Sequence, residues 1–336
     1  MLKIDGSHLE GGGQIVRTAV GLSSLTKKPV KIFNIRKNRP TPGLKHQHMK
    51  GIKALKSLCN AETKNLKLKS EIIDFFPSNI KHKSLKINIG TAGSITLILQ
   101  TLLIPSVKTK EKIEFEIIGG SNVKWSPPIE YFKHVFCWVL EKLGMDIDTK
   151  IIKYGFYPKG GGKVKVTIFP STLKPKNFLK KGQFIKTNLY SIASNDLKKS
   201  KVAERQTKKV KIKNLRKNIK YVNTESTGSA ISVHSNYINS RLAGNALGEK
   251  GKPAESVGKK ALTNLKKETN SKACLDKHMA DQIIPYMGLA VKNSDKKMAF
   301  TTSKITNHTK TNIWVTEKFL PVKFKIKENE IKCKKV

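Results

Sequence analysis

The sequence predicts an α+β fold built from repeated units and interrupted by a smaller inserted domain. Over residues 1–180, short β-branched runs alternate with helical patterns, and glycines separate the units. The composition then becomes polar and rich in lysine, and the earlier pattern returns near the end. With 336 residues the chain is long enough for about two domains with real cores, without disulfides or metals.

The first unit is expected to run strand, helix, strand, helix. The apolar run Leu2–Asp5 predicts a strand, and the helical spacing of Gly13–Leu25 predicts a helix after a glycine-rich turn. The β-branched run Val30–Ile35 predicts a second strand. Gly43–Cys59 again has helical spacing and predicts the second helix.

The same order of elements returns in the next part of the chain. Ser84–Ile89 and Lys112–Ile118 predict strands, and Ser94–Leu103 and Pro128–Gly144 predict helices. Two further strands are expected to close this unit, at Met145–Tyr154 and Lys163–Phe169. Repetition of this order favours a domain of repeated units.

An inserted domain is expected where the composition changes. Lys198–Lys220 carries eleven basic residues, and Lys252–Glu268 predicts one more helix. We therefore expect residues 183–270 to form a smaller inserted domain. The main domain is then discontinuous and comprises residues 1–182 and 271–336.

After the insert, the helix and strand patterns of the first part return at Ala280–Ala290, Lys297–Thr302 and Thr311–Phe324. His308 lies between short polar residues, just ahead of a β-branched run that favours a strand. From the sequence alone it fits a nucleophile, a metal ligand or a loop residue.

The net charge of +42, from 66 basic and 24 acidic residues, favours a polyanionic partner, above all nucleic acid. Only six basic residues are arginine, so part of the excess looks like a compositional bias towards lysine. In such a chain an arginine suggests a place that needs a planar fork of donors. Three of the six, Arg17, Arg36 and Arg39, lie within the first 40 residues.

The sequence gives no sign of a membrane segment or of export. Its apolar runs are far shorter than the roughly 20 residues that span a bilayer, and no early stretch has the length of a signal peptide. A cytoplasmic location is therefore expected. The cysteines lack the paired spacing of a zinc or redox motif and are expected to be reduced thiols: Cys59, Cys137, Cys274 and Cys333.

The stretch HLEGGGQIVR, residues 8–17, places an acid, three glycines, an amide and an arginine where a strand gives way to a helix. Backbone N–H groups at a helix N-terminus attract anions, and glycines let a phosphate approach closely. A tight turn with a capped helix explains the glycines equally well. Glu10 beside a phosphate would repel it unless a divalent cation lay between them.

A second stretch, IRKNRPTPGLKHQHMKG, joins Arg36 and Arg39 to Gln47 and His48 through a proline-stiffened turn. Two arginines followed by amide and imidazole donors form a plausible phosphate clamp. A zinc pair at His46 and His48 is the alternative, but no cysteine or third histidine stands nearby in the sequence.

Taken together, six spaced motifs resemble the RNA 3′-terminal phosphate cyclase family, in order and across nearly the whole chain. They are EGGGQxxR, IRxxRxxPGLxxQH, AGSxTLxLQ, GFYPxGGG, ADQ and HxxTNIxVxExFLPVxF. The resemblance implies a main domain of three repeated sheet-plus-two-helix units with an inserted smaller α/β, thioredoxin-like domain. It also implies ATP-dependent conversion of an RNA 3′-phosphate to a 2′,3′-cyclic phosphodiester, with release of AMP and pyrophosphate.

The family's functional residues can be carried over position by position. The adenylated histidine of the family falls on His308, and Glu10 matches the acid that binds a divalent cation, Mg or Mn. The residues that match ATP contacts are Arg17, Gln100, Pro127, His278, Met279, Ala280, Asp281 and Gln282. Those that match contacts to RNA phosphate or pyrophosphate are Arg36, Arg39, Gln47 and His48.

The resemblance also implies partners and alternatives. The expected partners are RNA 3′-phosphate ends and ATP, with no membrane and with a homodimer left open. Many members have tyrosine where this chain has His278, which predicts a weaker or pH-sensitive adenine stack. A non-catalytic branch works in ribosomal RNA processing without the adenylated histidine, and an enolpyruvyl transferase shares the repeated architecture. His308, Glu10, Arg17 and Arg39 favour the enzyme.

Overall fold

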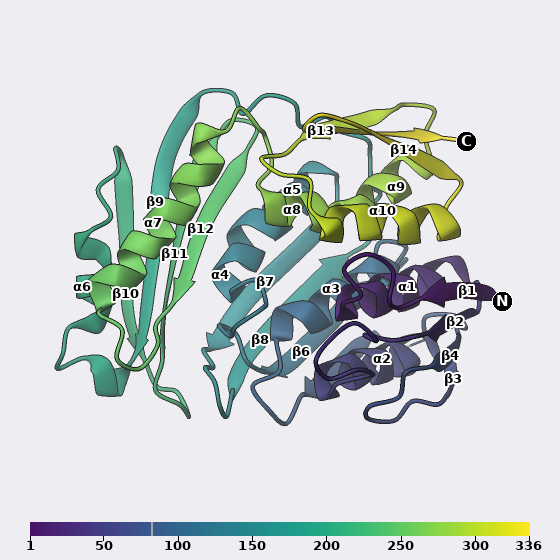
Figure 1. Ribbon diagram of the computed structural model, residues 1–336, viewed down its shortest axis with the longest axis horizontal. Coiled ribbons are helices and arrows are strands. Elements are labelled where there is room, and N and C mark those ends of the chain that lie inside the picture. The colour runs from purple at the N-terminus through teal and green to yellow at the C-terminus, as the bar shows by residue number, and fades with distance from the viewer. Residues whose placement is uncertain (82) are drawn as a thin grey trace.

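The computed structural model describes residues 1–81 and 83–336 and has the expected α+β architecture (Figure 1). Four sheets form within these residues, three of them in the main part of the molecule and one in the insert. Helices of the main part gather in one layer between the sheets, and the insert stands to one side (Figure 1). None of the described helices is long and apolar enough to span a bilayer.

The first unit forms a four-stranded sheet with the strand order β1-β2-β4-β3. β1 and β2 run parallel, whereas β4 pairs antiparallel with both β2 and β3. Its elements are β1 (Leu2–Asp5), α1 (Gly13–Thr26), β2 (Val30–Phe33), α2 (His46–Cys59), β3 (Glu62–Lys64) and β4 (Ile73–Phe76). The short strands β3 and β4 were not among the elements that the sequence predicted.

The second unit repeats this topology with the order β5-β6-β8-β7, again with one parallel pair followed by two antiparallel pairs. Its second helix contains a π-helical turn, Phe132–Phe136, between α4 and α5. The elements are β5 (Ser84–Asn88), α3 (Ile95–Ser106), β6 (Ile113–Gly119), α4 (Ile129–Tyr131), α5 (Cys137–Lys142), β7 (Asp146–Lys153) and β8 (Gly162–Phe169).

The third unit has the antiparallel order β13-β15-β14. Phe178 forms a parallel bridge with Phe300 on β13, in the place that β1 and β5 hold in the other units. The insert therefore interrupts the third unit between its first strand position and its first helix. The elements are α8 (Lys277–Gln282), α9 (Ile284–Lys292), β13 (Met298–Thr301), α10 (Asn307–Phe319), β14 (Val322–Lys327) and β15 (Glu330–Lys335).

The insert forms its own sheet, with the order β10-β9-β11-β12, and its own apolar cluster. Leu189, Val233, Leu242, Ala261 and Leu265 are among the buried residues of that cluster. Its elements are β9 (Phe184–Ser194), α6 (Val202–Lys208), β10 (Leu215–Val222), β11 (Ser229–Tyr237), β12 (Arg241–Leu247) and α7 (Ala254–Asn270). All of them lie inside the predicted limits of 183 and 270, which remain a prediction.

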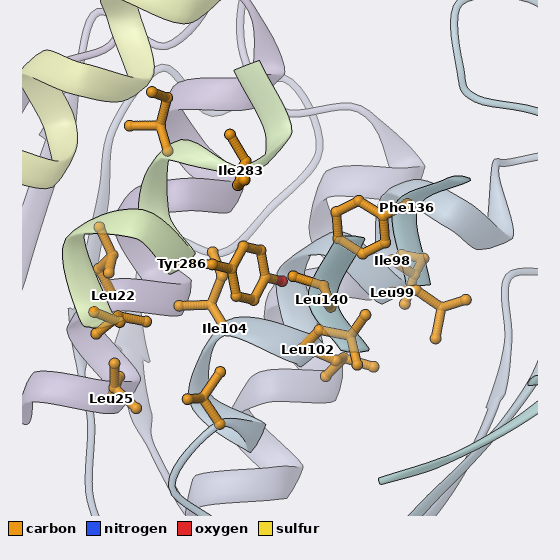
Figure 2. Packing of buried hydrophobic residues seen from close by; sticks show 14 of the residues in the cluster. Leu22, Leu25, Ile98, Leu99, Leu102, Ile104, Phe136, Leu140, Ile283 and Tyr286 are labelled. Carbon is orange, nitrogen blue, oxygen red and sulfur yellow. The ribbon is translucent and has the colours of Figure 1, made fainter. Parts of the chain in front are cut away.

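The main core is the helical layer shared by the three units (Figure 2). α3 is apolar and buried along almost its whole length, because α1 and α2 of the first unit pack against it. Figure 2 shows side chains of α1, α3, α5 and α9 meeting in this layer, among them Leu22, Leu102, Leu140 and Tyr286. This layer fixes the helix ends from which the candidate site is built.

One sequence-based expectation is wrong. The run after His308 was expected to be a strand, whereas Asn307–Phe319 is the helix α10. Thr306 caps the helix by accepting a hydrogen bond from the Thr309 N–H at 3.1 Å. The β-branched residues that suggested a strand, including Val315 and Thr316, are buried on the face of α10 that packs on α1 and α9. Tertiary burial therefore outweighs the local strand propensity.

Candidate active site

A glycine loop precedes α1 and lies against side chains from two other parts of the chain. Gly11 has φ +55°, which favours glycine. A Cβ atom on Gly12 would lie 3.3 Å from Nη2 of Arg39 and 3.9 Å from Cε1 of His308. On Gly13 it would lie 2.0 Å from Nε2 of His48, so only glycine fits there. The three glycines thus let the loop approach an arginine and two histidines closely.

His308 lies in the first turn of α10 and faces this loop. Its Nε2 lies 3.8 Å from Oε1 of Glu10, and its backbone carbonyl accepts a hydrogen bond from the Gln14 side chain at 3.2 Å. Its Nδ1 is buried and has no hydrogen-bond partner among the described residues. Because the side chain as a whole is 42% exposed, Nε2 is the nitrogen that a ligand can reach.

The surroundings of His308 keep its ring neutral at pH 7. Burial lowers its pKa below 6.5, Glu10 opposes this, and the positive charges of Arg17 and Arg39 lower it further. A neutral imidazole has a free lone pair on one nitrogen and is a nucleophile. The site therefore holds a neutral imidazole with a reachable edge beside two arginines.

A hydrogen-bonded chain holds α1, α8 and α10 together behind the histidine. The Thr18 hydroxyl donates to Oδ1 of Asn312 at 2.8 Å, and Nδ2 of Asn312 donates to the Asp281 carbonyl oxygen at 2.7 Å. Burial raises the pKa of the Asp281 side chain, and the charge of Arg17 opposes that rise. Burial lowers the pKa of Arg17 to about 10, so its guanidinium stays charged at pH 7. This chain fixes the position of α10 relative to the arginine.

The segment 278–282 lies on α8, whose start is capped by Asp276. The Asp276 carboxylate accepts from the backbone N–H groups of His278 and Met279 at 3.0 and 2.8 Å, and from the Tyr131 hydroxyl at 2.7 Å. Met279 and Ala280 are fully buried, so they support the site by packing. His278, which is exposed, and Gln282 face the cleft described next.

A cleft of about 700 Å³ joins most of the predicted ATP contacts. Nε2 of Gln100 donates to Oε1 of Gln282 at 2.8 Å, and the Pro127 carbonyl accepts from Thr96 at 2.8 Å, so both residues have fixed positions on its wall. The predicted residues that line the cleft are Arg17, Gln100, Pro127, His278, Asp281, Gln282 and His308. Its size is that of a typical small-ligand site.

The residues predicted to contact RNA phosphate lie in the α2 region, outside the lining of this cleft. Nη2 of Arg39 binds Oε1 of Glu10 at 2.5 Å, which brings it to the glycine loop beside His308. Arg36 is buried, and its Nη1 donates to the carbonyl oxygens of Thr41 at 2.5 Å and Gly43 at 3.0 Å, so it holds its own loop.

The two remaining residues of that group lie on α2. His48 is 5% exposed, and its Nδ1 accepts from the Lys45 N–H at 3.2 Å. Burial, reinforced by Arg17, lowers the pKa of His48 to about 3. Gln47 is half-buried and lies near Gly93, at the turn before α3.

Glu10 is the residue available for a divalent cation. No group of three or more His, Cys, Asp or Glu side chains suited to a metal occurs in the described residues. Magnesium, however, is commonly held by one or two carboxylates together with substrate phosphates and water. Arg39 occupies Oε1 of Glu10, which leaves Oε2 to meet a cation. The residues present therefore fit a cation that is shared with phosphate oxygens.

Several cleft residues were missed by the sequence-based prediction. Trp125 is 93% exposed with φ +61° and stands at the cleft, next to Lys124. Lys124 pairs at 3.6 Å with Glu249, which belongs to the insert. Asn245 and Lys260 of the insert also line the cleft. A tryptophan in a short polar stretch followed by two prolines is a signal that the sequence contains. Contacts between distant segments, in contrast, leave no trace in the sequence.

The fold and the cleft together define a class of protein: three sheet-and-helix units and a small insert that share a nucleotide-sized cleft next to a reachable histidine. The sequence model of the family described as RNA 3′-terminal phosphate cyclase matches residues 8–326. The chain belongs to this family.

Curated relatives support this assignment over the full length. A protein of Methanosarcina barkeri named RNA 3′-terminal phosphate cyclase is 44% identical over 335 residues, 98% of each chain. Proteins with the same name from Pyrococcus furiosus and Archaeoglobus fulgidus are 42% and 40% identical. Their alignments cover 97% and 98% of this chain and 95% and 99% of the relatives.

Proposed function

We propose that this protein is an RNA 3′-terminal phosphate cyclase that uses ATP and an adenylated His308. The observation that carries the proposal is the environment of that side chain. Its Nε2 is reachable, its Nδ1 is buried, and its pKa is lowered, so that the neutral ring faces Glu10, Arg39 and the glycine loop. The name and the full-length similarity of the relatives support the same reaction.

The reaction needs a leaving group better than oxide. Closing a cyclic phosphodiester on a terminal phosphate expels one of its oxygens, and adenylation turns that oxygen into part of AMP. In the first step, Nε2 of His308 attacks the α-phosphorus of ATP, a P–N bond forms, and the P–O bond to pyrophosphate breaks. A neutral imidazole is suited to this role because it both accepts an adenylyl group and releases it again.

Two further transfers complete the sequence. An oxygen of the RNA 3′-phosphate attacks the adenylyl phosphorus, the P–N bond breaks, and His308 is regenerated. The 2′-hydroxyl then attacks the 3′-phosphorus, loses its proton and displaces AMP. Each step exchanges one bond at phosphorus, so catalysis depends on positioning and on stabilising negative charge.

The cleft supplies residues for the nucleotide. Arg17 carries a charged fork of donors for phosphate oxygens, and Pro127 and His278 offer faces to the adenine. Gln100 and Gln282 offer amide donors and acceptors. Met279, Ala280 and Asp281 support this wall through packing and through the hydrogen bond from Asn312 to the Asp281 carbonyl.

Glu10 would hold Mg²⁺ or Mn²⁺ against the phosphates. When bound, such a cation supplies charge neutralisation on the transferred group. Arg39 fixes the carboxylate from one side. In this proposal Arg39, beside the glycine loop, and Gln47, near Gly93, contact the RNA end, while Arg36 and His48 shape the loop and helix that carry them.

Labelling with ATP that carries a labelled α-phosphate tests this proposal. The native chain should become covalently labelled in the presence of a divalent cation and without RNA. The label should be lost in acid and kept in alkali, as a phosphoramidate is. His308→Asn should abolish it, whereas His46→Asn, which replaces an exposed histidine of α2, should keep it. Label retained in His308→Asn would contradict the assignment.

A further inference from the structure

We propose that the outer face of the third sheet is a docking surface for the body of an RNA whose 3′ end lies in the cleft. This surface, the lysine face, consists of Lys323, Lys325, Lys332 and Lys334 on β14 and β15. The identity of the partner as RNA rests on the proposed function. The existence of a polyanion-binding face rests on the strand register and on its charges.

The register places like charges directly opposite each other. Lys323 lies opposite Lys334, and Lys325 lies opposite Lys332. All four side chains are exposed, because the alternate residues of both strands, such as Phe324 and Cys333, face the core. Opposed like charges destabilise a sheet. Two such pairs side by side need an explanation other than stability.

The nearby acids do not neutralise the face. Glu317 approaches Lys323 at 3.0 Å, and Glu330 approaches Lys332 at 2.8 Å. Within the described residues, Lys325 and Lys334 have no acidic group within 4.0 Å. Lys327, opposite Glu330, continues this face, whereas Lys335 lies opposite the buried Val322 and therefore belongs to the other side of the sheet. The face therefore keeps a net positive charge.

The second sheet has a similar strand order, but its opposed lysines have acidic partners. On its outer face, Nζ of Lys163 lies 2.9 Å from Glu116, and Nζ of Lys165 lies 3.1 Å from Glu114. Lys150 and Lys153 lie opposite Lys165 and Lys163. Their own Nζ atoms, however, are 3.9 Å from Asp148 and 3.3 Å from Glu225. A general excess of lysine would fill both faces alike. Opposed lysines thus occur in both sheets, and among the described residues of these two sheets only Lys325 and Lys334 are opposed lysines without an acidic partner.

Protection of an edge strand does not explain the pattern either. Lysines on an exposed edge prevent pairing with other chains, and β14 is an edge. Lys332 and Lys334, however, lie on β15, the central strand of the sheet. A flat field of lysines on a central and an edge strand fits the phosphate backbone of a nucleic acid, which carries a dense row of negative charges.

The geometry also indicates which RNA molecules would use this face. The 13-residue helix α10 leads from His308 to the start of β14 at Val322 and is about 20 Å long. With a step of about 3.4 Å, the rise per base pair of B-form DNA, this length corresponds to roughly six stacked nucleotides as the shortest path from the end in the cleft to the first lysine. Only an RNA longer than this can bind both sites.

A pair of matched variants tests the inference. Lys323→Thr, Lys325→Thr, Lys332→Thr and Lys334→Thr are combined in one chain. Lys86→Thr, Lys150→Thr, Lys163→Thr and Lys165→Thr are combined in the control. Both chains lose the same charge from strands of similar sheets. The probe is a 40-nucleotide RNA with a 3′-phosphate, whose dissociation constant is measured over a range of salt concentrations.

The lysine-face variant should bind the RNA more weakly, on the order of tenfold, and the slope of its salt dependence should fall by up to about 2.8 for single-stranded RNA. The control variant should change much less. The melting temperature of the lysine-face variant should stay equal or rise, because opposed lysines are removed. Equal loss of binding in both variants would show general attraction by net charge and would overturn the inference.

Two further measurements separate this inference from the proposed function. Self-labelling by ATP without RNA, and cyclisation of a four-nucleotide RNA, should be unchanged in the lysine-face variant. If the native chain does not label itself, the proposed function fails, while the difference in RNA binding still decides the docking surface. Loss of binding to vesicles of anionic lipid, with RNA binding intact, would assign the face to a membrane and overturn the proposal.

Discussion

Two helices of the main domain begin with a turn that carries a buried or partly buried histidine, and the two rings share similar electrostatics but differ in access. His48 in α2 and His308 in α10 both have pKa values lowered by burial, and the charge of Arg17 lowers both further. Only Glu10 acts in the opposite direction, and it acts on His308. By electrostatics alone, both rings are neutral at pH 7 and both would be candidates for catalysis.

Access separates the two rings. Nδ1 of His48 accepts a hydrogen bond from the backbone of Lys45, and its Nε2 lies against Gly13 with no room for a methyl group. His308 instead has an exposed edge that faces the glycine loop. A lowered pKa thus identifies buried imidazoles, and only an edge that a ligand can reach distinguishes the proposed nucleophile, His308, from His48.

The largest expected effect concerns Arg17, the charge common to both histidines. Arg17→Lys keeps a positive charge but loses the planar fork. Loss of a charge-assisted contact costs about 1.5 to 3 kcal/mol, so the rate of self-adenylation should fall roughly tenfold to a hundredfold at 1.36 kcal/mol per decade. Single-turnover labelling of His308 without RNA measures this rate.

Arg216→Lys is the control for this experiment. Arg216 lies in an exposed part of β10, and its replacement should change the labelling rate by less than about twofold. If Arg17→Lys labels as fast as Arg216→Lys, self-adenylation does not need the fork geometry of Arg17, and the prediction is wrong.

A second prediction uses the buried ring of His48. An unfolded histidine has a pKa near 6.5, whereas His48 in the folded chain has a pKa of about 3. Its contribution to stability is complete above pH 6.5 and is lost as the pH falls, because the unfolded state then binds a proton that the folded state excludes. Between pH 7 and pH 5 this loss amounts to about 2 kcal/mol.

Urea unfolding of the native chain and of His48→Gln at both pH values measures the effect. The variant should be less stable at pH 7 and should lose about 2 kcal/mol less than the native chain on going to pH 5. The difference between the two chains isolates His48 from other buried histidines such as His234. An identical loss in both chains would mean that His48 accepts a proton without unfolding.

The sequence predicted the repeated units well because their periodicity is strong. It missed β3 and β4, which are three and four residues long and have no clear alternation of polar and apolar residues. It also assigned a strand after His308, because the run there is β-branched. The cap at Thr306 favours a helix, but it outweighs the strand propensity only when α10 also packs on the neighbouring helices. Local signals therefore fail where tertiary contacts decide.

For the candidate site, too, the sequence predicted which residues come together but not what each of them contacts. Glycines, arginines and histidines in motifs led to the residues that the structure gathers at the cleft and its glycine loop. The motif could not separate Arg39, which reaches Glu10, from Arg36, whose Nη1 donates to the backbone carbonyls of Thr41 and Gly43 in its own loop. We expect Arg36→Lys to reduce stability more than either adenylation or transfer, because buried carbonyl groups then lose a donor.

The smallest expected effect is a displacement of the pH profile of self-adenylation. In the proposed mechanism the neutral ring of His308 is the reactive form, so the rate should stay level as the pH falls to the lowered pKa and decrease below it. Arg39 lowers that pKa, and Glu10 raises it. Arg39→Gln should therefore move the acid limb to higher pH, and Glu10→Gln should move it to lower pH.

Each substitution also frees the other charged group, because Arg39 and Glu10 are bound to each other at 2.5 Å. In Arg39→Gln the Glu10 carboxylate, no longer bound to the arginine, raises the pKa of His308 further. In Glu10→Gln the Arg39 guanidinium, no longer bound to the carboxylate, lowers that pKa further. In each variant this indirect effect has the same sign as the direct one. The readout is the midpoint of the acid limb in single-turnover labelling, which does not depend on the absolute rate that each variant retains. If the acid limbs of Arg39→Gln and Glu10→Gln move in the same direction, the titrating group is not His308. The contrast between His308 and His48 would then depend on access alone.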